Sequence, residues 1–246
     1  MERWKNKIAI VTGASSGIGA AIVLELIKCE MIVIGLARRI DRLEALRKQM
    51  SKEFEKNFHT KQCDVTKEEE ISNVFNWIDE KFQGVHVLIN NAGVMGTGMT
   101  MAPNNSDLLR RTFDTNVMGL LWCTREAFLL MKKYSIDDGH IIHMNSITGH
   151  NPPVMAGFHV YSASKHAVTT ITETHRRELL AEKTNIKISN ISPGIVDTEL
   201  YIGMSLPPET QYLQSIDIAN AVLYVLGTPP HVQVHDLIIK PIGEIF

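Results

Sequence analysis

The chain has few cysteines and no large excess of charge of either sign. Its cysteines, Cys29, Cys63 and Cys123, lie far apart with no CxxC pair, which argues against a disulfide framework or a zinc site. None of the ten histidines has HExxH-type spacing, so we expect no metal site. A net charge of −2 without a clustered basic stretch creates no field that would attract nucleic acid or an anionic membrane.

Long apolar runs are also missing. No run approaches the roughly 20 residues that a membrane-spanning helix needs. The N-terminus leads directly into a short apolar segment without the core of a signal peptide. We therefore expect a cytoplasmic protein with no stable membrane insertion. Hydrophobic residues make up 44% and charged residues 21% of the 246 residues, an ordinary composition for a globular protein.

Short apolar segments alternate with longer amphipathic ones along the whole chain. The predicted strands are residues 8–11, 31–37, 59–63, 85–90, 140–145, 186–191 and 234–239. The predicted helices are residues 17–28, 41–56, 67–81, 107–134, 161–182 and 216–226. Fully apolar strands that are each followed by a helix are typical of a parallel sheet covered on both faces. The sequence therefore predicts an α/β fold with a seven-stranded, mainly parallel sheet.

A glycine-rich turn joins the first predicted strand to the first predicted helix. Residues 12–19 read TGASSGIG. Glycines let the backbone turn tightly and approach a pyrophosphate closely, while free N–H groups at the start of the helix attract the anion. In this strand–turn–helix context the motif predicts a dinucleotide site.

The second predicted strand ends at two arginines. An acidic residue at this position would bind the ribose hydroxyls of NAD, whereas Arg38 and Arg39 can pair with the 2′-phosphate of NADP. We therefore favour NADP(H) as the cofactor. The two arginines could instead simply begin a charged helix.

Two further strands end in residues suited to cofactor contacts. Asp64 can accept a hydrogen bond from an adenine amino group, cap the helix that follows it, or do both. The small residues of Asn90-Asn91-Ala92-Gly93 allow the cofactor to approach the backbone at the carboxyl end of the fourth strand.

Tyr161 and Lys165 lie four residues apart, which places them on the same side of a helix. A nearby ammonium favours the ionised phenol and lowers the pKa of a tyrosine below its usual value of ~10. Such a tyrosine can exchange a proton with an alcohol or a carbonyl near neutral pH. Taken alone, the spacing is weak evidence, because chance places a tyrosine and a lysine four residues apart on many solvated helix faces.

Taken together, these motifs resemble the short-chain dehydrogenase/reductase family, and the resemblance covers essentially the whole chain. The matching segments include residues 12–19, residues 90–93, and the SPGIVDT sequence at residues 192–198. The resemblance implies one doubly wound Rossmann-type α/β domain over residues 1–246, with helices on both faces of the sheet. Its cofactor half would span about residues 1–145, and its catalytic and substrate half about residues 146–246.

The resemblance also implies which residues form the site. The catalytic residues would be Asn116, Ser146, Tyr161 and Lys165. Besides Tyr161 and Lys165, the cofactor-binding residues would be Gly13, Ser15, Ser16, Gly17, Ile18, Gly19, Arg38, Arg39, Asp64, Val65, Asn91, Ala92, Gly93, Pro193, Gly194, Val196 and Thr198.

Each catalytic residue would have a separate role. Tyr161 would donate or accept the proton, and Lys165 would lower the pKa of Tyr161 and bind the nicotinamide ribose. Ser146 would hold the substrate oxygen, and Asn116 would hold a water that links Lys165 to solvent.

The expected substrate walls, residues 94–101, 149–160 and 199–213, carry few charges. They contain Met95, Met99, Val154, Met155, Phe158, Tyr201, Ile202, Met204 and Leu206. Adaptable methionines and aliphatic residues favour an apolar alcohol or ketone. Within the family, the chain resembles an animal subgroup of farnesol dehydrogenases and ketosteroid-active enzymes. We therefore expect an NADP(H)-dependent dehydrogenase of a farnesol-type isoprenoid alcohol, and a ketosteroid or general carbonyl reductase is the alternative.

Two further expectations concern the class of the protein and its assembly. Some members of the family bind NADP(H) as sensors, but the four intact catalytic residues argue against that role here. The helices predicted at residues 107–134 and 161–182 carry apolar residues beyond one face, including Leu121, Phe128, Val168 and Ile171. The resemblance implies that these helices form a homodimer or homotetramer.

Overall fold

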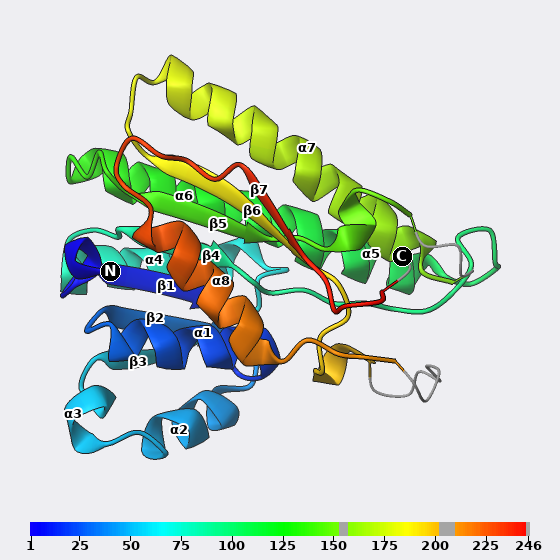
Figure 1. Cartoon of the computed structure of the whole chain (residues 1–246), viewed down its shortest axis with the longest axis horizontal. Coiled ribbons are helices and arrows are strands. Elements are labelled where there is room, and N and C mark those ends of the chain that lie inside the picture. Colours follow the sequence, from blue (N-terminus) through cyan, green and yellow to red (C-terminus); the bar gives the residue numbers. More distant parts are fainter. Residues whose placement is uncertain (153–156, 202–209, 245–246) are drawn as a thin grey trace.

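A seven-stranded parallel sheet forms the centre of the computed structural model, which describes residues 1–152, 157–201 and 210–244 (Figure 1). The strand order is β3-β2-β1-β4-β5-β6-β7, and every pairing is parallel. The sheet is therefore entirely, not mainly, parallel. The strands are β1 Ile8–Thr12, β2 Ile32–Ala37, β3 Phe58–Gln62, β4 Val87–Asn90, β5 His140–Met144, β6 Lys187–Pro193 and β7 Asp236–Ile239.

Helices cover both faces of the sheet, as predicted. Figure 1 shows α1 and α8 in front of the strands and α4 and α6 behind them. The helices are α1 Gly17–Lys28, α2 Ile40–Lys48, α3 Lys52–Glu55, α4 Glu68–Phe82, α5 Ser106–Phe113, α6 Gly119–Lys133, α7 His159–Ala181 and α8 Ser215–Gly227. Shorter helical turns are Glu2–Trp4, Ile147–Gly149 and Glu199–Tyr201.

The apolar strands supply the core on both faces. All residues of β1 and β5 are buried, because each strand has helices on both sides of it. Val11 and Val33 belong to the cluster that packs against α1 and α8. Ile10 and Ile34 belong to the cluster that packs against α4 and α6. Each such side chain contributes roughly 1.5–3 kcal/mol by its burial.

The predicted helices at residues 41–56 and 107–134 are both interrupted. The first divides into α2 and α3, because Ser51 has an extended backbone with φ −63° and ψ 154°. Serine favours such breaks, since its hydroxyl competes for backbone hydrogen bonds. The second contains a π-helical segment, Asp114–Met118, between α5 and α6. The strand bounds differ from the predicted ones by about two residues or fewer.

The strand order creates a crevice at one end of the sheet. From β1 the chain extends outward through β2 to β3, and it then returns to place β4 on the other side of β1. Ligands of such sheets bind at this reversal, beyond the carboxyl ends of the strands. The turn after β1 and the segment after β4 therefore face the same space.

No helix in the described ranges is long and apolar enough to cross a membrane. Across those same ranges, no group of three His, Cys, Asp or Glu side chains could hold a metal ion.

Candidate active site

A cavity of about 540 Å³ lies beyond the carboxyl ends of the strands. Every residue predicted to bind the cofactor lines it, as do three of the four predicted catalytic residues. The exception is Asn116. The cavity also has lining residues that the sequence did not indicate, among them Arg111, Thr115 and Met144.

The glycine turn is held from behind by the segment that follows β4. The Thr12 hydroxyl accepts hydrogen bonds from the backbone N–H groups of Asn91 (3.0 Å) and Ala92 (2.9 Å). The Asn91 side chain donates to the carbonyls of Thr12 (2.9 Å) and Gly13 (3.3 Å). Asn91 therefore shapes the turn, in addition to lining the cavity.

Glycine is required at two positions of this turn. Gly13 has φ +65°, and a Cβ there would lie 2.8 Å from the Ala92 Cα. A Cβ at Gly19 would lie 2.3 Å from the Gly13 carbonyl oxygen. Both distances are far below van der Waals contact. The backbone around the turn is thus close-packed and lines the cavity, which fits the pyrophosphate of a dinucleotide.

Tyr161 is 6% exposed and lies in the first part of α7. Burial raises the pKa of its phenol to about 12, and a hydrogen bond with the Ser146 side chain opposes part of this rise. The direction is opposite to the one predicted from the Tyr161–Lys165 pair alone. Loss of solvation is the largest cause of this shift.

Lys165 is 5% exposed, and its Nζ lies 5.6 Å from the centre of the Tyr161 ring. The Nζ donates a hydrogen bond to the Met144 carbonyl oxygen at 2.8 Å, which directs the ammonium toward the end of β5. Burial lowers the pKa of Lys165 to about 8. The Lys165 ammonium therefore loses its proton at a lower pH than the Tyr161 phenol does.

Ser146 follows β5 and begins the helical turn Ile147–Gly149. Its Oγ accepts hydrogen bonds from the backbone N–H of Thr148 (3.2 Å) and from the Thr148 hydroxyl (3.1 Å). Both bonds leave the Ser146 proton available to an oxygen in the cavity. Ser146 and Tyr161 thus form a pair of hydroxyl groups that can bind one carbonyl or alcohol oxygen.

Asn116 lies in the π-helical segment and is buried. Its Oδ1 accepts from the Val94 backbone N–H (2.8 Å), and its Nδ2 donates to the Val94 carbonyl and to the Ser164 hydroxyl (both 3.0 Å). The side chain therefore joins the segment after β4 to α7 beside Lys165. π-Helical turns are frequent at functional sites. That Asn116 holds a water near Lys165 stays a prediction.

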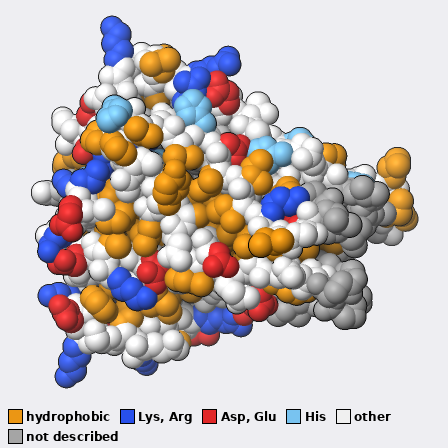
Figure 2. Space-filling model, viewed as in Figure 1, with side chains coloured by type: hydrophobic (Ala, Val, Ile, Leu, Met, Phe, Trp, Pro, Cys, Tyr) orange, Lys and Arg blue, Asp and Glu red, His pale blue; other side chains and the backbone are white. Residues whose placement is uncertain are grey.

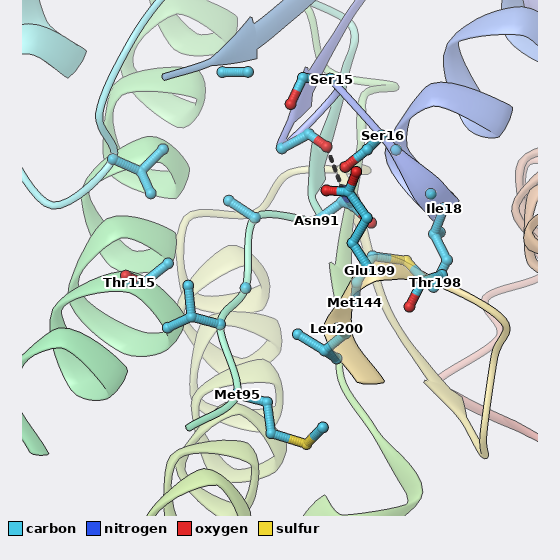
Figure 3. Close-up of a pocket in the computed structure, with 18 of the residues that line it drawn as sticks. Ser15, Ser16, Ile18, Asn91, Met95, Thr115, Met144, Thr198, Glu199 and Leu200 are labelled. Carbon is cyan, nitrogen blue, oxygen red and sulfur yellow. Dashed lines mark hydrogen bonds between the residues drawn. The ribbon is translucent and has the colours of Figure 1, made fainter. Parts of the chain in front are cut away.

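Arg39 lies next to the glycine turn. Its Nη2 donates to the hydroxyls of Ser16 (2.9 Å) and Ser15 (3.3 Å), and its Nη1 pairs with Glu199 at 2.9 Å. Figure 3 shows Glu199, next to Thr198, among the labelled residues of the cavity lining. Sequence reasoning placed Glu199 in a substrate wall but missed its pairing with Arg39, because nothing near it in the sequence marks a partner 160 residues away.

Asp64 does not cap the helix that follows it. Helix α4 begins at Glu68 with Lys67 as its N-cap residue. The Asp64 carboxylate instead accepts from the backbone N–H (3.0 Å) and hydroxyl (2.9 Å) of Thr66. This local turn holds the Asp64 side chain in the wall of the cavity.

The predicted substrate walls are only partly described. Met95, Leu200 and Tyr201 line the cavity, whereas Met99 is 56% exposed and lies outside the lining. Phe158 is partly buried and also lies outside the lining. Outside the described residues lie Val154, Met155, Ile202, Met204 and Leu206.

Comparisons with known proteins place the chain in a known class. A family profile described as short chain dehydrogenase matches residues 7–205. Farnesol dehydrogenase of Aedes aegypti is 51% identical over 246 residues, which cover 100% of both chains. Dehydrogenase/reductase SDR family member 11 of Mus musculus is 40% identical over 255 residues, covering 100% of this chain and 98% of the mouse protein.

Solved structures of other proteins are similar to this chain over nearly its whole length. The closed form of serine dehydrogenase with NADP⁺ has a TM-score of 0.85 and 28% identity, covering 97% of this chain and 96% of the other. An actinorhodin polyketide ketoreductase variant with NADPH has a TM-score of 0.83 and 27% identity, covering 96% of each chain. Fold and cavity define a Rossmann-type, nicotinamide-dependent oxidoreductase. The chain belongs to the short-chain dehydrogenase/reductase family.

Proposed function

We propose that the protein is an NADP(H)-dependent dehydrogenase that interconverts an apolar alcohol and its carbonyl compound. One observation carries the proposal: Ser146, Tyr161 and Lys165 line the same cavity as the glycine turn and Arg39. A single cavity thus joins a dinucleotide-binding turn to a buried proton-transferring pair. When bound, the oxidised cofactor supplies the hydride acceptor and a positive charge.

In this proposal Tyr161, Ser146 and Lys165 act on the reacting oxygen and its proton, and Asn116 positions the elements around them. Tyr161 takes the proton of the substrate alcohol, or returns it to the carbonyl oxygen in the reverse direction. Ser146 donates a hydrogen bond to the same oxygen. Lys165, held by the Met144 carbonyl, stabilises the ionised phenol electrostatically. Asn116 is a positioning residue, because it fixes Val94 to α7 beside Lys165.

Different parts of the cavity lining would hold different parts of the cofactor. The turn from Gly13 to Gly19 would hold the pyrophosphate, and Asp64 with Val65 would face the adenine. Residues 91–93, residues 193–198 and Lys165 would hold the nicotinamide end. Arg39 carries the preference for NADP(H), because its guanidinium lies beside the glycine turn, where it donates to the Ser16 hydroxyl, and a guanidinium can bind a 2′-phosphate.

The substrate that we propose is an isoprenoid alcohol of the farnesol type. The mosquito relative is named a farnesol dehydrogenase, and Met95, Leu200 and Tyr201 give the described part of the cavity an apolar wall. The second candidate is a ketosteroid or another carbonyl compound, since the same wall would accept it. A non-catalytic NADP(H) sensor would need the glycine turn but no buried Tyr161–Lys165 pair.

A substrate panel tests this function. Purified protein is assayed with farnesol, a hydroxysteroid and small polar alcohols, each with NADP⁺ and with NAD⁺. We expect kcat/KM for farnesol to exceed that for small polar alcohols at least tenfold, and NADP⁺ to be preferred. Equal rates on all alcohols would refute the apolar site, and preference for NAD⁺ would refute the cofactor assignment.

We also propose that the protein is a homodimer or homotetramer. Exposed apolar residues lie on α8 and β7, with Ile216 42%, Tyr224 64% and Ile238 50% exposed, and Figure 2 shows apolar side chains gathered on this face. On α7, Val168 is fully buried within the chain, so the prediction that it contributes to the contact between copies of the chain is wrong. Leu180 on the same helix is 68% exposed. Sedimentation would distinguish a monomer, dimer and tetramer.

A further inference from the structure

The carboxylate of Glu199 occupies the arginine end of the cavity. One of its oxygens pairs with Arg39 Nη1 at 2.9 Å, and the other pairs with Arg42 Nη1. The second guanidinium nitrogen of Arg39 donates to the hydroxyls of Ser16 and Ser15. The guanidiniums of Arg39 and Arg42 are therefore already paired with one negative charge that belongs to the protein.

Glu199 reaches this position from the segment that follows β6. It begins the helical turn Glu199–Tyr201, directly after Thr198. The Thr198 side chain packs on the glycine turn, since a Cβ at Gly17 would lie 3.1 Å from its Cγ2. Leu200 and Tyr201, the next residues, line the cavity. The same short segment thus touches both the arginine end and the apolar wall.

Charge makes Glu199 a competitor for another anion. Hydrogen bonds from Arg42 and Arg39 hold the pKa of the Glu199 carboxyl below its usual value, so it is ionised at neutral pH. A phosphate and a carboxylate cannot both take the same guanidinium edge, and their charges repel each other. A dinucleotide without a 2′-phosphate makes no demand on these groups.

We propose that Glu199 is a specificity-determining residue, whose carboxylate competes with the 2′-phosphate of NADP(H) for Arg39. This inference rests on the proposed function. NADP(H) must separate Glu199 from Arg39, whereas NAD(H) leaves the pair intact. Glu199 therefore reduces the preference for NADP(H) that the arginines create.

The expected size of the effect is modest. The side chains of Glu199, Arg39 and Arg42 are 42–43% exposed, so solvent and salt screen the pairs. Arg42 can also keep its contact with Glu199 while Arg39 turns to the phosphate. Removal of the charge should thus change the affinity for NADP⁺ by about three- to tenfold.

Calorimetric titration of the full chain tests the competition without an activity assay. The dissociation constants of NADP⁺ and NAD⁺ are measured for the wild type, Glu199→Gln and Glu182→Gln. Glu182 is a matched control, because it pairs with Lys132 at 2.6 Å, is 46% exposed and lies outside the cavity lining. Each variant removes one negative charge from the chain.

For Glu199→Gln we expect the Kd of NADP⁺ to fall about three- to tenfold and that of NAD⁺ to change less than twofold. Glu182→Gln should alter neither. An unchanged or weaker affinity for NADP⁺ overturns the competition, as does an equal gain for both cofactors, which would mean that Glu199 simply obstructs the cavity. The cofactor assignment and the competition by Glu199 are refuted by different results. A wild type that prefers NAD⁺ refutes the cofactor assignment, whatever the affinity of Glu199→Gln.

Discussion

Replacement of Lys165 by methionine is the sharpest test of how the buried pair works. Methionine preserves much of the aliphatic length and removes the charge. The Nζ lies 5.6 Å from the centre of the Tyr161 ring. At an effective dielectric constant of ~20, a positive unit charge at that distance stabilises the ionised phenol by ~3 kcal/mol. That energy corresponds to about two pKa units of Tyr161.

The assay is the pH profile of kcat/KM for alcohol oxidation at saturating cofactor. At pH 7 Lys165 is mostly protonated, because its pKa is about 8. Loss of its charge should raise the pKa of Tyr161 and leave less phenolate at any given pH. We expect the Lys165→Met variant to lose about 100-fold in kcat/KM at pH 7 and its inflection to move about two pH units upward.

Lys187 provides a matched control. It is 4% exposed, and its Nζ donates to the carbonyls of Pro229 and Val232, away from the cavity lining. Lys187→Met should lower the melting temperature without moving the inflection. If Lys165→Met keeps its rate within threefold of the wild type, or keeps the wild-type inflection, the electrostatic role of Lys165 is wrong.

Three further predictions concern the turn, the cofactor and acid stability. Gly19→Ala should weaken NADP⁺ binding at least tenfold in calorimetry, since its Cβ would lie 2.3 Å from a carbonyl oxygen. In the control variant Gly227→Ala the new Cβ meets nothing within 4 Å, so NADP⁺ should bind normally. Equal binding by both variants refutes the assignment of the glycine turn as the pyrophosphate site. Arg39→Ala should raise the Kd of NADP⁺ at least tenfold more than that of NAD⁺, and a parallel rise contradicts the 2′-phosphate contact. Burial lowers the pKa of His140 from 6.5 to about 3, so the unfolded chain binds more protons between these values, and stability falls as pH falls through this window. In melting curves from pH 7 to 4.5, His140→Gln should flatten that fall, and the exposed His231→Gln should not; the same slope in both contradicts it.

The sequence predicted the sheet well, because the apolar strands are buried on both faces. Motifs that lie directly after strands predicted part of the cavity lining, because the parallel topology brings those strand ends together. The interruption at Ser51 could not be predicted, since the amphipathic pattern continues through it.

Two features of the site depend on contacts that no sequence pattern encodes. Glu199 meets Arg39 only because the chain crosses the cavity after β6. The pKa of Tyr161 is raised, not lowered, because its burial depends on how α7 packs against the rest of the fold. The neighbouring lysine can be read from the sequence, but the loss of solvation cannot.

The central claim is that Tyr161 transfers the substrate proton in a cofactor-dependent oxidation of an apolar alcohol. The most direct test mixes the purified protein with NADP⁺ and farnesol and follows the absorbance of the reduced nicotinamide, for the wild type and Tyr161→Phe. The account predicts reduction by the wild type and less than about one per cent of that rate for the variant, with NADP⁺ affinity unchanged within threefold. A variant that keeps more than a few per cent of the rate while binding NADP⁺ normally would contradict it.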